Sequence, residues 1–198
     1  MKAIQKLKLT VLVLVATSVF GASSMVAQTN TKKEADKRND AKFENADDAE
    51  LLVKAYNSGM AEVKLADKMK TRAVSAEVKA LASKMSMEHS AMNAKIQEVA
   101  TKKNISLPTQ LTNDQVEDVA DVTKESATEI DMEYLDQLSD SHKKSIELFE
   151  KGSKATDLDI RDIFISGLPK IRSHYDMVQN TRQKMKDQKE SQRKSGMK

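Results

Sequence analysis

Four stretches of the chain repeat apolar side chains at steps of three and four residues, the spacing of one face of an α-helix. They cover about residues 47–70, 75–103, 123–151 and 157–187. The second stretch has the most regular series, formed by Val78, Ala82, Met85, His89, Met92, Ile96 and Val99. A helix with a single apolar stripe buries that stripe against another element. The pattern therefore predicts four helices packed against one another.

The connections between these stretches indicate two antiparallel hairpins. Short links lie near residues 71–74 and 152–156, whereas about 20 residues, including Pro108, separate the second stretch from the third. Two helical hairpins joined by a long crossover form the ferritin-like layout of a four-helix bundle. Pro169 lies inside the fourth stretch, where its ring removes a helical hydrogen bond, so we expect a kink or a restart there.

The N-terminal segment has the pattern of a cleaved signal peptide. Three lysines precede the apolar run Leu9–Phe20, and small residues follow before Gln28. The run is shorter than the roughly 20 residues that span a bilayer, although an uncleaved anchor is the alternative. No cysteine follows, so we expect no lipid anchor. We expect residues 1–27 to be the signal peptide, 28–46 a flexible leader, 47–187 the bundle and 188–198 a basic flexible tail.

Composition narrows the class of protein. Five glycines, two prolines and no tryptophan among 198 residues argue against a β-sandwich or barrel, and the absence of cysteine excludes disulfides. The formal charge of +3 comes entirely from the lysines of segment 1–27, so a nucleic-acid partner is not indicated. The basic stretch Arg182–Lys194 predicts either a peripheral contact with an anionic envelope surface or a solvated helix end.

The three histidines and one glutamate occupy seam positions of the four predicted helices. They are Glu62, His89, His142 and His174. Helix bundles build metal sites from such inward side chains, so one interpretation is a transition-metal site. The other is that each histidine is a core residue hydrogen-bonded to a neighbour such as Asp131, Tyr134 or Glu62. Counting residues from the links places His89 with His142 in one layer and Glu62 with His174 in another, which argues against one ion bound by all four.

Methionines near these histidines raise a narrower hypothesis. Met85 and Met92 share a face with His89, and Met177 follows His174 by three residues, a donor set suited to Cu(I). A di-iron centre is excluded because no histidine is preceded by glutamate at the required spacing of three. No nucleophile, phosphate loop or organic-cofactor motif is present in the sequence, so we expect no enzyme and no catalytic residues.

Several runs of residues together resemble one bacterial family. They are Ala61–Ala66, Val78–Ala82 with Met85 and Glu88-His89, Leu107-Pro108, Ile130–Leu135, Ser141-His142 with Leu148-Phe149, and Leu168-Pro169 with His174. In order and spacing they resemble the exported proteins labelled domain of unknown function 4142, often called outer-membrane proteins. The family usually has Phe-Asp where Ile130-Asp131 stands here. The resemblance implies a ferritin-like four-helix fold and export, and it implies no settled activity.

These observations predict a periplasmic or outer-membrane-associated protein of the cell envelope with a binding, structural or stress-related role. The alternative is a periplasmic protein that binds copper, zinc or another transition metal through the buried histidines and Glu62. The sequence identifies neither a partner nor an oligomeric state.

Overall fold

The structure is a computed structural model that describes residues 31–42 and 46–195. The predicted signal peptide, residues 1–27, lies outside these ranges. The described residues form six α-helices and no strand, so the all-α prediction is confirmed for them. The helices are α1 (Lys32–Asp40), α2 (Asp47–Arg72), α3 (Ala76–Lys102), α4 (Asn113–Lys124), α5 (Ile130–Gly152) and α6 (Leu158–Ser195).

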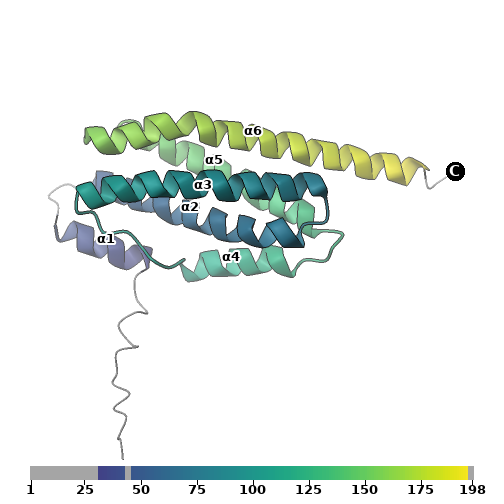
Figure 1. The fold of residues 1–198 in the computed structure, drawn as a ribbon, viewed down its shortest axis with the longest axis horizontal. Coiled ribbons are helices and arrows are strands. Elements are labelled where there is room, and N and C mark those ends of the chain that lie inside the picture. Colours follow the sequence, from purple (N-terminus) through teal and green to yellow (C-terminus); the bar gives the residue numbers. More distant parts are fainter. Residues whose placement is uncertain (1–30, 43–45, 196–198) are drawn as a thin grey trace, which may run out of the picture.

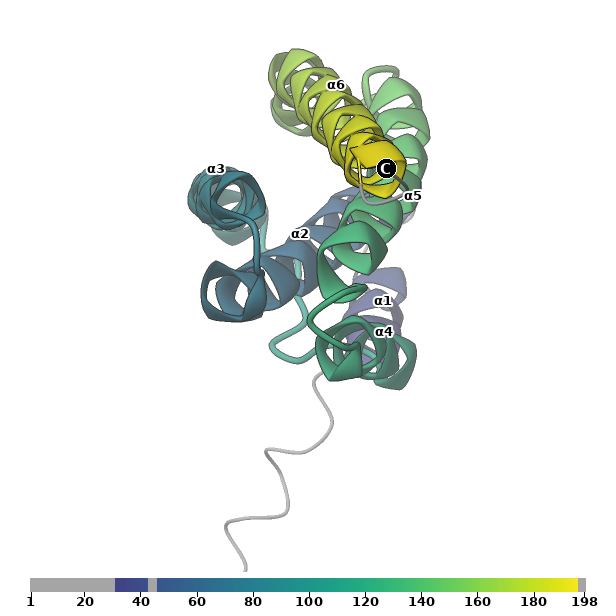
Figure 2. The same ribbon diagram turned by 90° about the vertical axis from the view of Figure 1, so that its right-hand side faces the viewer.

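The four long helices lie lengthwise beside one another (Figure 1). The most extensive contacts are between α2 and α3 and between α5 and α6, and the two pairs meet through α2 with α5 and through α3 with α6. The shorter helices α1 and α4 both pack against α2, on the side away from α6 (Figure 2). Helix α4 thus belongs to the long connection between the two pairs and covers part of α2 and α5.

Local hydrogen bonds fix where the helices begin. The Ser75 hydroxyl accepts from the backbone N–H of Glu77 at 3.2 Å, and Thr112 with Gln115 forms a capping box at the start of α4. The Asp131 carboxylate accepts from the backbone N–H groups of Val74 and Ser75 at 2.9 and 2.7 Å. Asp131 therefore ties the α2–α3 link to the beginning of α5.

The buried apolar side chains form two clusters, one toward each end of the long helices. The first includes Leu65, Met85, Leu138 and Val178, and the second includes Leu52, Ile96, Phe149 and Ile171. Along each of the four long helices, one polar seam residue lies between its contributions to the two clusters. These four residues are Glu62, His89, His142 and His174, and they make a polar layer between the two apolar clusters.

Two expectations for the periphery differ from the structure, and of the two alternatives at Pro169, a kink or a restart, the restart is excluded. Part of the expected flexible leader forms helix α1, in which Asn39 is buried and exchanges hydrogen bonds with the backbone of Ser106. Helix α6 extends to Ser195, through most of the expected flexible tail. It also continues through Pro169 without a restart.

The continuity of α6 follows from what its flanks bury. A proline inside a helix costs about 3 kcal/mol. The side chains of Phe164 and Ile171, on either side of Pro169, are fully buried, and each such burial contributes about 1.5–3 kcal/mol. Packing of the two flanks therefore outweighs the hydrogen bond that Pro169 removes. Among the described residues, none of the helices is both long enough and apolar enough to cross a membrane.

Candidate metal centre

The four polar seam residues meet in a single buried cluster. Glu62 is 5% exposed, His89 is 3% exposed, and His142 and His174 are 0% exposed. One ring nitrogen from each histidine can be chosen so that all three nitrogens lie within 4.8 Å of one another. The ring centroids are 5.1–5.5 Å apart. The cluster thus combines one residue from each of α2, α3, α5 and α6.

Glu62 supplies the carboxylate that faces the imidazoles. Its Oε2 atom lies 2.9 Å from Nε2 of His89 and 3.5 Å from Nε2 of His142. The Nδ1 atom of His174 lies 3.2 Å from the same Nε2 of His89. The carboxylate and three ring nitrogens therefore converge on a common volume.

Outer hydrogen bonds orient two of the rings. Nδ1 of His142 donates to the carbonyl oxygen of Leu138 at 2.9 Å, so its Nε2 carries the lone pair. Nε2 of His174 lies 2.6 Å from Oε2 of Glu88, which directs its Nδ1 toward His89. Such bonds from a carbonyl or carboxylate to the outer nitrogen are typical of histidines that bind metals through the inner one.

Glu88 is itself held by two lysines. Nζ of Lys84 lies 2.6 Å and Nζ of Lys170 3.2 Å from the Glu88 carboxylate. The hydrogen bonds from Lys84 and His174 lower the pKa of Glu88 to about 2. Glu88 is therefore an ionised acceptor that fixes the tautomer of His174.

Burial and the mutual charges shift the pKa values within the cluster. Burial lowers the pKa of His142, and it lowers that of His174 to about 4. Burial also lowers the pKa of His89, but the Glu62 carboxylate outweighs it and the net shift is upward. For Glu62, burial alone raises the pKa, and the imidazoles of His142 and His89 reverse this to about 2. Near neutral pH the cluster thus presents two neutral imidazoles and a carboxylate, the forms that bind metal ions.

Several buried polar atoms of the cluster have no hydrogen-bond partner among the described residues. They include Oε1 of Glu62, Nε2 of His142 and the hydroxyl of Tyr134. Burial and the nearby Glu62 charge both raise the pKa of Tyr134. Because an unpaired buried polar group costs about 1–3 kcal/mol, these atoms indicate that the cluster has room for a ligand.

The estimate of two separate layers was wrong. In the α5–α6 pair, Gly167 and Gly152 contact the rings of Phe149 and Phe164, and the same antiparallel register sets His142 opposite His174. The estimate placed the turn at the middle of the link. In the structure the link is asymmetric, because the backbone N–H of Asp157 is anchored to Asp48 of α2 and α6 begins only at Leu158.

The same reasoning applies to α2 and α3. Gly59 packs directly against Asn93, a register that brings Glu62 beside His89. All four residues consequently share one layer. The depth estimate missed this because facing residues are equidistant from about residue 76 in the α2–α3 pair and about residue 158 in the α5–α6 pair, a few residues beyond the link centres that it assumed.

The methionines are divided between the centre and the apolar interior. Met85 is fully buried in the first apolar cluster, and Met177 packs against that cluster. Met92 lines a cavity of about 10 Å³ together with Glu62 and His89. That volume matches a single water molecule or ion. Glu88 was not among the sequence candidates, and its place directly before His89 was the signal that could have identified it.

The described residues are helical and hold a buried cluster of three histidines and one glutamate. These two features define the class of protein. The chain belongs to the family described as Domain of unknown function (DUF4142), whose model matches residues 32–181. A solved structure, the crystal structure of a DUF305 fragment from Deinococcus radiodurans, is similar with a TM-score of 0.63. The two chains are 9% identical in sequence, and the match covers 69% of this chain and 95% of that chain. At this identity the similarity shows the fold alone. No curated protein matches the chain.

Proposed function

We propose that this protein is an exported metal-binding protein that holds one divalent transition-metal ion, Zn²⁺ in the first instance, with His89, His142, His174 and Glu62. The observation that carries the proposal is the convergence of three buried ring nitrogens within 4.8 Å of one another beside a buried carboxylate. Three imidazoles with one carboxylate is a donor set that zinc accepts.

The distances between donor atoms fit a tetrahedral ion. Zinc–nitrogen and zinc–oxygen bonds of about 2.0–2.1 Å place neighbouring donors about 3.3 Å apart in a tetrahedron. The separations are 3.2 Å between ring nitrogens of His89 and His174, and 2.9 and 3.5 Å from Oε2 of Glu62 to His89 and His142. Small side-chain rotations would equalise these values around one ion.

The alternative of hydrogen-bonded core histidines has less support. Asp131, one expected partner, uses its carboxylate for the backbone of Val74 and Ser75. Tyr134, the second, has a hydroxyl with no hydrogen-bond partner among residues 31–42 and 46–195. Glu62, the third, lies 2.9 Å from Nε2 of His89, so the alternative holds for His89 alone among these partners. A metal ion would pair the lone pair of His142 Nε2, which the alternative leaves unpaired.

The donor set favours zinc over Cu(I). Cu(I) selects thioether ligands. Met85 belongs to the first apolar cluster and Met177 packs against it, whereas Met92 shares a cavity with one imidazole, that of His89. A copper site is therefore the second candidate, supported by Met92.

The cellular setting is part of the proposal. The pattern of residues 1–27 supports export to the periplasm, and the order and packing of α2, α3, α5 and α6 support a ferritin-like four-helix bundle. Contact of the basic stretch Arg182–Lys194 with an envelope surface has weaker support, because Arg182, Lys184 and Lys194 form ion pairs within the protein. A metal-binding role replaces a purely structural one as the better explanation of the buried layer.

Metal titration of the protein purified without a histidine tag tests the proposal. The chain has only three histidines, so any histidine-bound metal reports on this centre. We expect one equivalent of Zn²⁺ to bind saturably in competition with a chromophoric chelator, and binding to be lost in His89→Ala. Ser139→Ala, a buried polar control on α5 that does not line the cavity beside His89, is expected to bind one equivalent. Absence of saturable binding by the unaltered protein would refute the proposal.

A further inference from the structure

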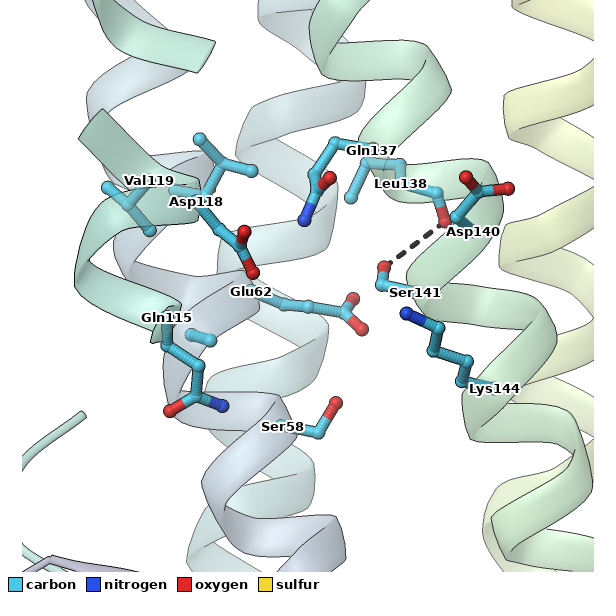
Figure 3. A pocket seen from close by; sticks show the side chains of 12 residues that line it. Ser58, Glu62, Gln115, Asp118, Val119, Gln137, Leu138, Asp140, Ser141 and Lys144 are labelled. Atoms are coloured by element: carbon cyan, nitrogen blue, oxygen red, sulfur yellow. Dashed lines mark hydrogen bonds between the residues drawn. The ribbon is translucent and has the colours of Figure 1, made fainter. Parts of the chain in front are cut away.

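We infer that metal ions reach and leave the centre through the cavity between α2, α4 and α5, with the Glu62 carboxylate as the first ligand of the centre that an arriving ion meets. The inference rests on the proposed metal-binding function and adds a route to it. The cavity has a volume of about 280 Å³ and is lined from three helices (Figure 3). Its polar lining includes Ser58, Glu62, Asp118, Gln137, Asp140 and Lys144.

Glu62 is the residue that connects the cavity to the centre. It lines the 280 Å³ cavity, and its Oε2 atom lies 2.9 Å from His89 on the other side. The three imidazoles are not among the residues that line the cavity. Glu62 is 95% buried, its side chain extends into the cavity in Figure 3, and its Oε1 atom has no hydrogen-bond partner within the described ranges. This oxygen is itself buried, so an ion in the cavity binds it once the Glu62 side chain turns toward the cavity, before the ion contacts an imidazole.

The charges of the lining favour a cation. Glu62, Asp118 and Asp140 contribute three carboxylates, against the single ammonium of Lys144. Asp140 is also 3.5 Å from the exposed amine of Lys143, a pair that solvent screens. A concave surface lined by one sign of charge raises the local concentration of the opposite ion and its association rate. The cavity thus attracts divalent cations toward Glu62.

The other approach to the imidazoles is less favourable. A groove of about 350 Å³ lies between α3 and α6, and its charged lining consists of Glu88, Lys95 and Lys170. Glu88 is already bound to His174, Lys84 and Lys170. Two ammonium groups and an occupied carboxylate repel a cation, so this groove does not serve as the route.

Charge variants of the cavity test the route by the rate of metal binding. The double variant Asp118→Asn/Asp140→Asn removes two carboxylates from the lining, and Lys144→Gln removes the ammonium. The association rate constant is measured by stopped flow with Co²⁺, whose absorption reports tetrahedral ligation, at low and high salt. We expect the rate to fall about three- to tenfold in the double variant and to rise in Lys144→Gln, with both effects reduced by salt.

Matched controls carry the same charge changes on the same helices outside the cavity. Glu117→Gln on α4 with Glu147→Gln on α5 matches the acidic pair, and Lys151→Gln on α5 matches Lys144→Gln. All three control positions are exposed and do not line the cavity. We expect the control variants to bind Co²⁺ at the rate of the unaltered protein.

A steric variant tests the same route independently of charge. Ala61 lines the cavity beside Glu62, and Ala61→Met places a longer side chain there without disfavouring the helix. We expect slower association and slower chelator-driven release, with the equilibrium affinity retained. Equal rates in all variants, with one equivalent still bound, would overturn the route alone. Failure of the unaltered protein to bind Co²⁺ or Zn²⁺ would overturn the proposed function and the route with it.

Discussion

The replacement His142→Ala tests two contributions of this imidazole to the free energy of unfolding. One is present in the metal-free protein, and the other is expected only when metal is bound. The side chain is fully buried, and its Nδ1 donates to the Leu138 carbonyl at 2.9 Å. Removing a buried hydrogen-bonded group of this kind costs about 1–3 kcal/mol. We therefore expect the variant in the presence of chelator to be less stable than the unaltered protein by that amount.

On the proposed function, we expect metal to add a second contribution, which His142→Ala lacks. At free Zn²⁺ about 100 times the dissociation constant, an ion bound only to the folded state stabilises it by about 2.7 kcal/mol. For a chain of this size, that is a rise in melting temperature of about 5–10 °C. Circular dichroism at 222 nm during thermal unfolding, with chelator and with buffered Zn²⁺, measures both contributions.

The comparison of six melts, three proteins each with chelator and with Zn²⁺, tests the prediction. We expect the Zn²⁺-dependent rise in the unaltered protein and in Ser139→Ala, a buried replacement one turn from His142, and none in His142→Ala. A melting temperature of the unaltered protein that is the same with chelator and with Zn²⁺ would refute the reasoning. A full rise in His142→Ala would show that Zn²⁺ binds elsewhere.

Three further predictions concern the pH dependence of stability, the contact between Glu88 and His174, and the packing of Gly167. The folded-state pKa values of His142 and His174 lie below the ordinary 6.5, so the unfolded chain binds more protons than the folded protein at acidic pH. The free energy of unfolding of the metal-free protein should therefore fall as the pH drops from about 6.5 toward 4. Urea unfolding at several pH values measures this fall. Glu88→Gln should weaken Zn²⁺ binding about 10- to 100-fold with one equivalent retained, as measured by chelator competition, because Glu88 orients His174. Gly167→Ala should destabilise the fold by about 1–3 kcal/mol in urea unfolding, since its Cβ would lie 2.5 Å from the Phe149 ring; an unchanged midpoint would contradict the packing there.

The helices and the burial of the site residues could be predicted from local sequence. Steps of three and four residues place Glu62, His89, His142 and His174 on apolar stripes, and all four are buried. Which side chains a helix buries depends on the spacing of its own apolar residues, and that spacing can be read from the sequence.

The single layer could not be predicted, because it depends on how far the helices of each pair slide past one another. Close contacts between distant residues set that register, such as Gly59 with Asn93 and Gly167 with Phe149. An error of one or two helical turns is enough to separate side chains that meet in the structure. Helix α1 was not predicted for a related reason. It is held by a hydrogen bond between Asn39 and Ser106, which are 67 residues apart in sequence.

X-ray absorption at the zinc edge, on protein loaded with one equivalent of Zn²⁺, tests the central proposal most directly. We expect four nitrogen or oxygen neighbours at about 2.0–2.1 Å, with the outer-shell scattering of three imidazole rings. In Glu62→Ala, the three imidazoles should remain and the carboxylate oxygen should be replaced. Six oxygen neighbours, a sulfur neighbour at about 2.3 Å, or fewer than three imidazoles would contradict a centre built from His89, His142, His174 and Glu62.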